Sequence, residues 1–573
     1  MRLEDYWGVG PKTSDRLRET LGTEAAIEAI ESADVRALTD AGVTRGRATS
    51  ILRRANDDAG MDVLGTRDAR EVYDDLLARA SEYALTRHAA DRIRVVTPLT
   101  SPSAVEARLD AVEDARAAWR GLDETDRESV VDAFETYDAA DGTDRAAVEA
   151  VLALRAAGLR GDTFAALGDV DDDALREAAG ALQYLTDEGV EPGADDRLDD
   201  LRDRLADARE LESSAFDVLE RVRETGVRDL ADFRGAFVDY VAAETRLTGS
   251  AVRSAAPDEA HDAADFVSSS LRALVADLSD RVEQRESDVE ADLRASIADA
   301  RTDVDRAVAA VDDVAFDLSL ARFAEAHDLT RPTVGTDGLA VEGAANPFLD
   351  DPQRVSYAVG DHGLDAPAGD RVAVLTGANS GGKTTLLETC CSVALLAAMG
   401  LPVPADRAEV GLFDTVVFHR RHASFNAGVL ESTLKSIVPP LSDDGRTLML
   451  VDEFEAITEP GRAADLLNGL VDLTVDRAAL GVYVTHLADD LSPLPPAARI
   501  DGIFAEGLTS DLELRVDYQP RFGTVGKSTP EFIVSRLVAN ARDRAERQGF
   551  ESLAAAVGEE AVQRTLSDAR WQE

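Results

Sequence analysis

The most constraining feature of this chain is a glycine-rich loop between two apolar segments, RVAVLTGANSGGKTTLLETCC, residues 371–391. Gly377-x-x-x-x-Gly382-Lys383-Thr384 has the spacing of a phosphate-binding loop, in which backbone N–H groups surround phosphate oxygens at a helix N-terminus. Lys383 is expected to reach the β- and γ-phosphates, and the Thr384 hydroxyl to bind Mg²⁺. An accidental glycine-rich turn is disfavoured, because a strand-like and a helix-like segment flank the loop. The predicted ATP-binding residues here are Gly377, Ala378, Asn379, Ser380, Gly381, Gly382, Lys383, Thr384 and Thr385.

Two further apolar runs end in polar residues that fit the same chemistry. TLMLVDEFEA places Asp452 and Glu453 at a strand end, where we expect Asp452 to hold Mg²⁺ and Glu453 to polarise the attacking water. GVYVTH ends in His486, which we expect to sense or position the γ-phosphate. The predicted ligands are therefore ATP and Mg²⁺, and the predicted catalytic residues are Glu453, Lys383 and His486. A solvated acidic pair and a structural histidine are the alternatives.

The chain is very acidic along its whole length. Its 573 residues hold 61 Lys+Arg and 111 Asp+Glu, a formal net charge of −50, and only four lysines. This pattern favours a protein of a concentrated-salt cytosol, although codon bias also explains scarce lysine. At about 1 M salt the Debye length is ~3 Å, so the net charge does not exclude a polyanionic partner. No membrane-spanning segment or signal peptide is predicted, and we expect a cytoplasmic protein whose adjacent Cys390 and Cys391 are core residues.

The periodicity of apolar residues divides the chain into five parts. Residues 1–57 form two glycine hairpins before amphipathic helices, 61–197 a helical core, and 198–325 a coiled-coil arm that returns to the core. Residues 335–545 alternate short strands with helices, which predicts an α/β domain with a mostly parallel sheet, and 546–573 form a helical tail.

The arm is predicted to be a long antiparallel coiled coil with its tip near Pro257. A helix of about 50 residues would extend ~75 Å. A spacer or a dimer contact is the simpler role for such an arm. One side of the seam is led by Leu198, Leu201, Leu205, Ala208 and Leu211, the other by Leu271, Leu274, Leu278, Val282, Val289 and Leu293.

The two N-terminal repeats resemble paired helix-hairpin-helix motifs. Gly8-Val9-Gly10 and Gly42-Val43 each lead into a helix whose backbone N–H groups can bind a DNA phosphate. Such contacts do not read base sequence, so we expect sequence-independent binding. A helical module that docks a protein is the alternative. The candidate DNA-binding residues are Gly8, Gly10, Lys12, Thr13, Gly42, Arg45 and Arg47.

Several motifs in this order resemble the MutS family of DNA-repair ATPases. TGANSGGKTT is very close to the phosphate loop of that family, and AHDLTRPTV followed by GAANPFL looks like its junction into the ATPase domain. RHASFNAGVLEST, GTVGKSTPEFIVSRL and TPLTSPSAVEARLDAVEDA are similar to further family segments. The resemblance covers roughly residues 70–540 and is strongest over 345–540.

The resemblance implies an α/β ABC-type P-loop ATPase domain at the C-terminal side, preceded by an all-α lever and the arm. The tandem helix-hairpin-helix module at residues 1–57 lies outside the segment that the resemblance covers. The resemblance also implies a homodimer in which each ATP site is completed by the other subunit, with Ser424 as the contact across the dimer, and an arm that acts as a clamp around a duplex. Tyr357 matches the position of an adenine-stacking aromatic residue, and Tyr518 is a second candidate. An ordinary core or surface tyrosine is the alternative for both.

The sequence also departs from the family pattern. FEAITEPG stands where the family has Gly-Arg-Gly-Thr-Ser after Asp-Glu, and neither the mismatch-wedge domain nor a C-terminal Smr domain is found, which suggests an archaeal MutS-like branch. We therefore expect an ATP-hydrolysing homodimer that binds duplex or branched DNA, in repair or recombination rather than mismatch recognition. The alternatives are a MutS-like ATPase acting on stalled ribosomes and a coiled-coil repair ATPase of the Rad50 kind.

Overall fold

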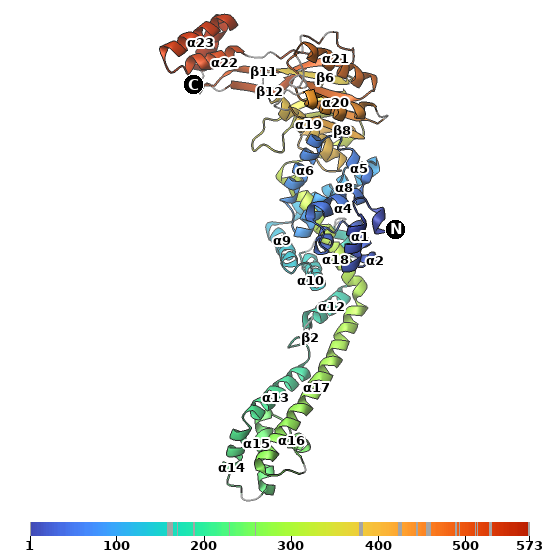
Figure 1. Ribbon diagram of the computed structural model, residues 1–573, viewed down its shortest axis with the longest axis vertical. Helices are drawn as coiled ribbons and strands as arrows, with labels where there is room; N and C mark the ends of the chain where they lie inside the picture. The colour runs from blue at the N-terminus through green and yellow to red at the C-terminus, as the bar shows by residue number, and fades with distance from the viewer. Residues whose placement is uncertain are drawn as a thin grey trace. The chain divides into compact units, whose positions relative to one another are not determined.

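The computed structural model describes residues 2–157, 164–168, 170–186, 189–227, 230–257, 259–377, 382–421, 427–442, 445–453, 460–487, 490–491, 493–509, 512, 514–526 and 530–570. The chain forms two compact units, the first mainly Met1–Val131 with Asp312–Glu573, the second mainly Asp132–Leu159 with Phe164–Val311 (Figure 1). The boundaries fall inside the helices α9 (Glu124–Ala139) and α18 (Arg301–Ala326), so the compact units do not coincide with the five predicted parts.

The first unit contains the predicted α/β domain. Its six-stranded sheet has the order β12-β11-β6-β10-β9-β8, and all neighbouring strands are parallel except β11 and β12. The strands predicted from the sequence are confirmed as β6, β8, β9 and β10. The sheet consists of β6 (Val372–Gly377), β8 (Thr415–His419), β9 (Thr447–Val451), β10 (Leu480–Val484), β11 (Ala498–Leu508) and β12 (Leu514–Arg521).

Helices cover both faces of this sheet, which explains why its central strands are continuous apolar runs. Val372 and Val374 face a core shared with α20 (Ala427–Ser442) and α21 (Pro460–Asp476). The alternate residues of β6 face a second core, which includes α19 (Lys383–Ala398) and a four-stranded sheet. That smaller sheet has the order β3-β7-β4-β5 and consists of β3 (Thr333–Val334), β4 (Asp337–Ala344), β5 (Val355–Asp361) and β7 (Arg407–Val410).

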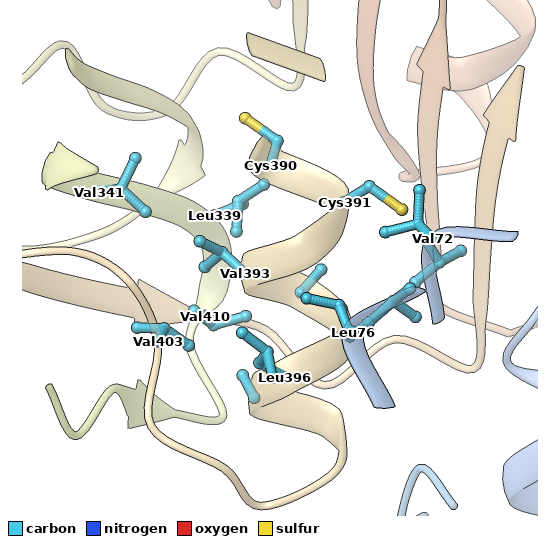
Figure 2. Packing of buried hydrophobic residues seen from close by; sticks show 14 of the residues in the cluster. Val72, Leu76, Leu339, Val341, Cys390, Cys391, Val393, Leu396, Val403 and Val410 are labelled. Atoms are coloured by element: carbon cyan, nitrogen blue, oxygen red, sulfur yellow. The ribbon is translucent and has the colours of Figure 1, made fainter. Parts of the chain in front are cut away.

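The helix α19 is buried along nearly its whole length and holds both cysteines. Figure 2 shows Cys390 beside Leu339 and Val341 of the small sheet and Cys391 beside Val72. Both thiols are free and buried, and burial raises the pKa of Cys390 to about 12. The prediction that they are core residues is confirmed.

Residues 2–57 form a small helical module with its own core, built around Leu17, Ile30, Leu38 and Ile51. Val95, which follows α7, belongs to the same core, so the module packs on the next segment of the chain. The module consists of η1 (Leu3–Asp5), α1 (Pro11–Thr20), α2 (Thr23–Glu31), α3 (Val35–Asp40) and α4 (Arg45–Asn56), followed by α5 (Asp58–Asp62), α6 (Arg67–Ser81), α7 (Arg87–Arg94) and α8 (Pro102–Gly121).

The start of α6 is joined to the edge strand β8. The Thr66 hydroxyl donates to the Phe418 carbonyl at 2.6 Å and accepts from the Phe418 N–H at 3.1 Å. The Gly65 N–H donates to the Val416 carbonyl at 3.0 Å. The segment that follows the N-terminal module is therefore hydrogen-bonded to the edge strand of the large sheet.

The second unit contains the predicted arm, and its first limb differs from the prediction. The limb is not one long helix, because α13 ends at Ser213. A second break follows α14, where Gly226 has a φ of +84°, the left-handed conformation that glycine favours. The long helix is α17, which has 37 residues. The described elements are α10 (Asp144–Ala156), α11 (Ala165–Gly168), α12 (Asp172–Tyr184), β1 (Leu185–Thr186), β2 (Gly189–Val190), α13 (Asp196–Ser213), α14 (Ala215–Glu224), α15 (Leu230–Thr245), α16 (Gly249–Ala255) and α17 (Ala263–Asp299).

The predicted apolar seam is nevertheless present. Its members from α13 and α17 share one core, in which Leu293 is partly buried. Arg285 pairs with Asp195 at 2.6 Å and Arg202 with Glu286 at 2.9 Å, which aligns α13 beside the later part of α17, as Figure 1 shows. α14, α15 and α16 complete the same core with Phe237 and the other residues of that cluster, so this part of the arm is a helical bundle.

The C-terminal helices pack on one another around Val534, Val538, Ala554 and Val562. They are α22 (Pro530–Ala539), α23 (Arg544–Val557) and α24 (Glu559–Arg570), so this group begins before the predicted boundary at residue 545. Among the described residues, no helix is both long enough and apolar enough to span a bilayer.

Candidate active site

The loop after β6 begins and ends on glycines that no other residue could replace without strain. Gly377 has a φ of +129°, and a Cβ there would lie 2.2 Å from the Ile503 carbonyl oxygen of β11. Gly382 is the left-handed N-cap of α19, with a φ of +72°, and a Cβ there would lie 2.7 Å from the Tyr518 ring. The predicted ligands Ala378, Asn379, Ser380 and Gly381 lie outside the described residues.

The first residues of α19 point their polar groups back toward the strand ends. Lys383 is buried, and its Nζ donates to the Gly377 carbonyl at 2.9 Å, so the lysine lies across the base of the loop. The Thr384 hydroxyl donates to Oδ2 of Asp452 at 2.5 Å. The structure thus brings together the lysine, the threonine and the aspartate that the sequence predicted, although they are separated by about seventy residues.

Asp452 and Glu453 follow β9, and hydrogen bonds that their N–H groups donate to the two neighbouring strands fix their backbone. The Asp452 N–H donates to the His419 carbonyl at 2.9 Å, and the Glu453 N–H donates to the Val484 carbonyl at 3.1 Å. Burial raises the pKa of Asp452 despite the hydrogen bond from Thr384. Its Oδ1 is buried and, among the described residues, has no hydrogen-bond partner.

These atoms fit a bound Mg²⁺. A buried carboxylate oxygen without a partner is costly, so Oδ1 of Asp452 is suited to a cation. The described part of the chain has no group of three or more His, Cys, Asp or Glu side chains that could hold a metal. Asp452 and Thr384 instead suit an ion that takes its remaining ligands from phosphate and water, as Mg²⁺ does in nucleotide sites.

The carboxylate of Glu453 is held on both sides. His486 Nε2 lies 2.7 Å from Oε1, and Arg421 Nη1 lies 2.5 Å from Oε2. The hydrogen bond with His486 lowers the pKa of Glu453, and the charge of Arg421 acts in the same direction. Glu453 has a φ of +42°, a strained value for a residue with a side chain, and such strain is concentrated at functional sites.

Arg421 is a site residue that the sequence analysis missed. It lies two positions beyond the end of β8, and its side chain is about half exposed. The available signal was the pair Arg420-Arg421 directly after an apolar strand, the same placement that singled out Asp452 and His486. Only the strand order, with β8 beside β9, shows that the second of the two arginines reaches Glu453.

A cavity of about 450 Å³ opens beside these groups. Asn346 lies at its edge, and the buried amide of Asn346 donates to the Thr385 carbonyl at 3.3 Å and to Glu388 at 3.0 Å, which anchors α19. The sequence analysis assigned Asn346 no role. The cavity is also lined by Leu349, Gln353, Val355, Gly382, Lys383, Thr384, Leu386, Thr389, Glu453 and Tyr518.

The prediction that Tyr357 stacks on adenine is wrong. Its side chain is 2% exposed, stacks on Phe522 at 5.9 Å between ring centroids, and donates from its hydroxyl to Asp501 at 3.1 Å. Burial also raises its pKa well above the usual value. Tyr518, in contrast, is 40% exposed and lines the cavity, so it remains the predicted adenine contact. Ser424, the predicted contact across the dimer, lies outside the described residues.

The predicted DNA-binding residues lie at two helix N-termini of the N-terminal module. Gly10 is the N-cap of α1, where Lys12 is exposed and Thr13 is buried. Gly8 and Gly42 both have φ near +80°, as hairpin glycines do. The first N–H groups of a helix have no intrahelical acceptor, and neither α1 nor α4 has a side-chain cap.

The two hairpins are braced against each other. Arg47 of α4 donates to the Gly8 carbonyl at 3.0 Å, and Arg16 of α1 donates to the Gly42 carbonyl at 2.7 Å. Arg45 pairs with Asp91. The predicted arginines therefore have partners within the protein, and Arg47 holds the opposite hairpin as well as lying on the surface.

A strand–loop–helix phosphate site with acidic and histidine groups at the ends of neighbouring strands defines a P-loop ATPase domain. Residues 373–438 match the family model of MutS domain V, an ABC-type ATPase domain. This part of the chain is therefore similar to the ATPase domain of the MutS family.

Three relatives illustrate the similarity. The DNA-binding protein MutS2 of Pyrococcus furiosus is 43% identical over 219 residues, 38% of this chain and 39% of the relative. The DNA mismatch repair protein MutS of Natronomonas pharaonis is 29% identical over 469 residues, 74% of this chain and 53% of the relative. The DNA mismatch repair protein MutS 2 of Halobacterium salinarum is 31% identical over 344 residues, 56% and 38% of the two chains. This chain spans about half the length of these relatives or less.

Proposed function

We propose that this protein is an ATP-dependent DNA-binding protein that hydrolyses ATP in a homodimeric composite site and binds duplex or branched DNA without sequence specificity. The observation that carries the ATPase part is the set of contacts that joins Thr384 to Asp452 and Glu453 to His486, beside a cavity lined by Lys383, Thr384 and Glu453. Its role is in DNA repair or recombination rather than in mismatch recognition.

In this proposal each side chain has one task. Lys383 exchanges its bond to the Gly377 carbonyl for the phosphates of ATP. Thr384 and Asp452 hold Mg²⁺, which neutralises phosphate charge when bound. Glu453 orients the attacking water and accepts its proton, while His486 fixes the direction of the Glu453 carboxylate.

The DNA-binding part is supported by the charge of the N-terminal module. Residues 1–57 hold nine basic and ten acidic residues, although the whole chain has 61 against 111. Within the module, α4 carries four arginines and no acidic residue. The cationic helix α4 has an uncapped N-terminus, and so does α1, whose hairpin is hydrogen-bonded to that of α4. Two such N-termini suit phosphate binding through N–H groups that point at the phosphate oxygens. Two of the three relatives are named for mismatch repair and the third for DNA binding.

The homodimer is proposed from the family resemblance, with Ser424 reaching the nucleotide of the partner subunit. Bound ATP would then hold two subunits together, and hydrolysis would release them. The arms are proposed to contribute to a clamp around the duplex, which couples DNA release to the nucleotide cycle.

Glu453→Gln is the test of the ATPase part. The amide keeps the shape of the side chain but cannot accept a proton, so hydrolysis should fall by about 10²-fold or more, given the ~10²–10⁴ of general-base catalysis. ATP binding should remain, and an ATP-bound dimer should accumulate, which light scattering would detect as a doubled mass. Glu551→Gln, on the exposed face of α23, is the matched control and should hydrolyse ATP normally. Normal turnover in Glu453→Gln would refute the assignment.

A further inference from the structure

Trp7 is the most exposed aromatic residue that the structure describes in the first unit. Its side chain is 56% exposed, although it lies between Tyr6 and Val9, which are buried in the core of the N-terminal module. Trp7 directly precedes Gly8 of the first hairpin. The corresponding position of the second hairpin, before Gly42, holds Ala41, which is 4% exposed. The indole is thus a feature of one hairpin only, and the fold does not bury it.

The indole is held against the basic helix. The Arg54 guanidinium of α4 lies over the Trp7 ring, 5.6 Å from its centroid. Arg54 is itself fixed by Asp58 at 2.7 Å and Asp62 at 3.0 Å. A cation over the face of an aromatic ring attracts it, so the position of Trp7 is defined although its side chain is largely in solvent.

The surroundings of Trp7 favour an anionic partner with flat apolar groups. Arg47, bonded to the Gly8 carbonyl, places a second cation of α4 beside the residue that follows Trp7. The uncapped N-terminus of α1 begins at Gly10, three residues after it. Nucleic acid combines phosphates, which suit Arg47 and the N–H groups of α1, with aromatic bases, which suit the indole.

We propose that Trp7 stacks on an unpaired nucleobase of DNA, so that the first hairpin recognises single-stranded positions next to a duplex. In a continuous duplex the faces of the bases are covered by their neighbours, whereas an unpaired base offers its face to an aromatic side chain. Every base has such a face, so stacking adds structural preference without sequence preference. This inference rests on the proposed binding of DNA by residues 1–57 and specifies which DNA structure they prefer.

The test compares two ligands without ends, a covalently closed circular duplex and the same circle with a short single-stranded gap. Trp7→Ala should weaken binding to the gapped circle by about tenfold, consistent with the cost of removing one stacked base, and should leave binding to the closed circle within about twofold. Trp7→Phe should restore most of the preference, because a smaller aromatic ring still stacks. Leu553→Ala, which removes an exposed apolar side chain from α23 of the C-terminal helices, is the control and should change neither affinity.

Fluorescence provides an independent readout, because direct stacking on a base quenches an indole. The chain has three tryptophans, so the quenching due to Trp7 is the difference between the wild type and Trp7→Phe. We expect this difference with the gapped circle and little with the closed circle.

Three outcomes would overturn the inference. Equal losses on both circles would show a general duplex contact, and no loss on either circle would show that Trp7 does not contribute to DNA binding. A stronger preference for a matched RNA ligand would replace DNA as the partner. In the first two cases the proposed DNA binding stands, whereas a preference for RNA, or a wild type that binds neither circle, would contradict the proposed function itself.

Discussion

Asp317→Asn should make the first compact unit more stable at neutral pH. Asp317 lies on α18, and burial raises its pKa to about 6, against an ordinary value of 3.8, although Arg92 and Arg108 oppose this shift. In the folded protein the carboxyl therefore keeps its proton between about pH 4 and 6, where the unfolded chain has lost it. The free energy of unfolding consequently falls as the pH rises from about 4 to 6. Above this range it stays lower by the full amount.

The size of the effect follows from the shift in pKa. One unit corresponds to about 1.4 kcal/mol, so a shift of about two units costs roughly 3 kcal/mol at pH 7. Thermal unfolding of the wild type and Asp317→Asn should give nearly equal melting temperatures at pH 4 and a separation of a few degrees at pH 7, in constant salt. Asp472→Asn, which removes an exposed carboxylate of α21 in the same compact unit, is the control. A difference that is the same at both pH values would refute the reasoning.

Three further predictions concern the function. Arg421→Ala should lower kcat for ATP hydrolysis by about tenfold with little change in KM, because Oε2 of Glu453 loses its partner while His486 still holds Oε1. An unchanged kcat would show that the ion pair between Arg421 and Glu453 has no role in catalysis. The double variant Lys12→Glu, Arg47→Glu should weaken duplex binding in a filter-binding assay and leave basal ATPase activity unchanged. It is preferable to deleting residues 1–57, because Val95 packs in the core of that module and the deletion would expose it. Asp15→Lys is the control of opposite charge. A single G·T mispair should add less than the ~1.4 kcal/mol of a tenfold preference over homoduplex, because hairpins that contact phosphates do not probe stacking within a continuous duplex; competition binding that gave tenfold or more would disprove this.

The phosphate loop was predictable because its chemistry is local. The spacing of Gly377, Gly382, Lys383 and Thr384, between a buried strand and a helix, requires one backbone conformation, and the two glycines indeed adopt positive φ values. Asp452 and His486 were predictable for a similar reason: parallel strands that start in the same core end at the same edge of the sheet. The seam of α13 and α17 also follows from local periodicity.

The arm shows where local periodicity stops being sufficient. The spacing of apolar residues continues past Ser213 and predicts one long helix, but the chain turns after α13 and again at Gly226. The sequence pattern shows only that one face of the helix is apolar. Whether that face packs against one helix or joins a bundle depends on residues such as Phe237 and Phe266, whose rings meet at 5.3 Å only after the chain has turned.

What the sequence by itself determined is the set of groups proposed to bind and hydrolyse ATP, because those groups are specified by short spacings within single strand–loop–helix units. Only the tertiary structure decided which neighbours these groups have. Tyr357 became a core residue because Phe522 and Asp501, more than 140 residues away, close over it. Arg421 became a partner of Glu453 because β8 lies beside β9. Such contacts depend on the order of strands in the sheet, which no local pattern contains.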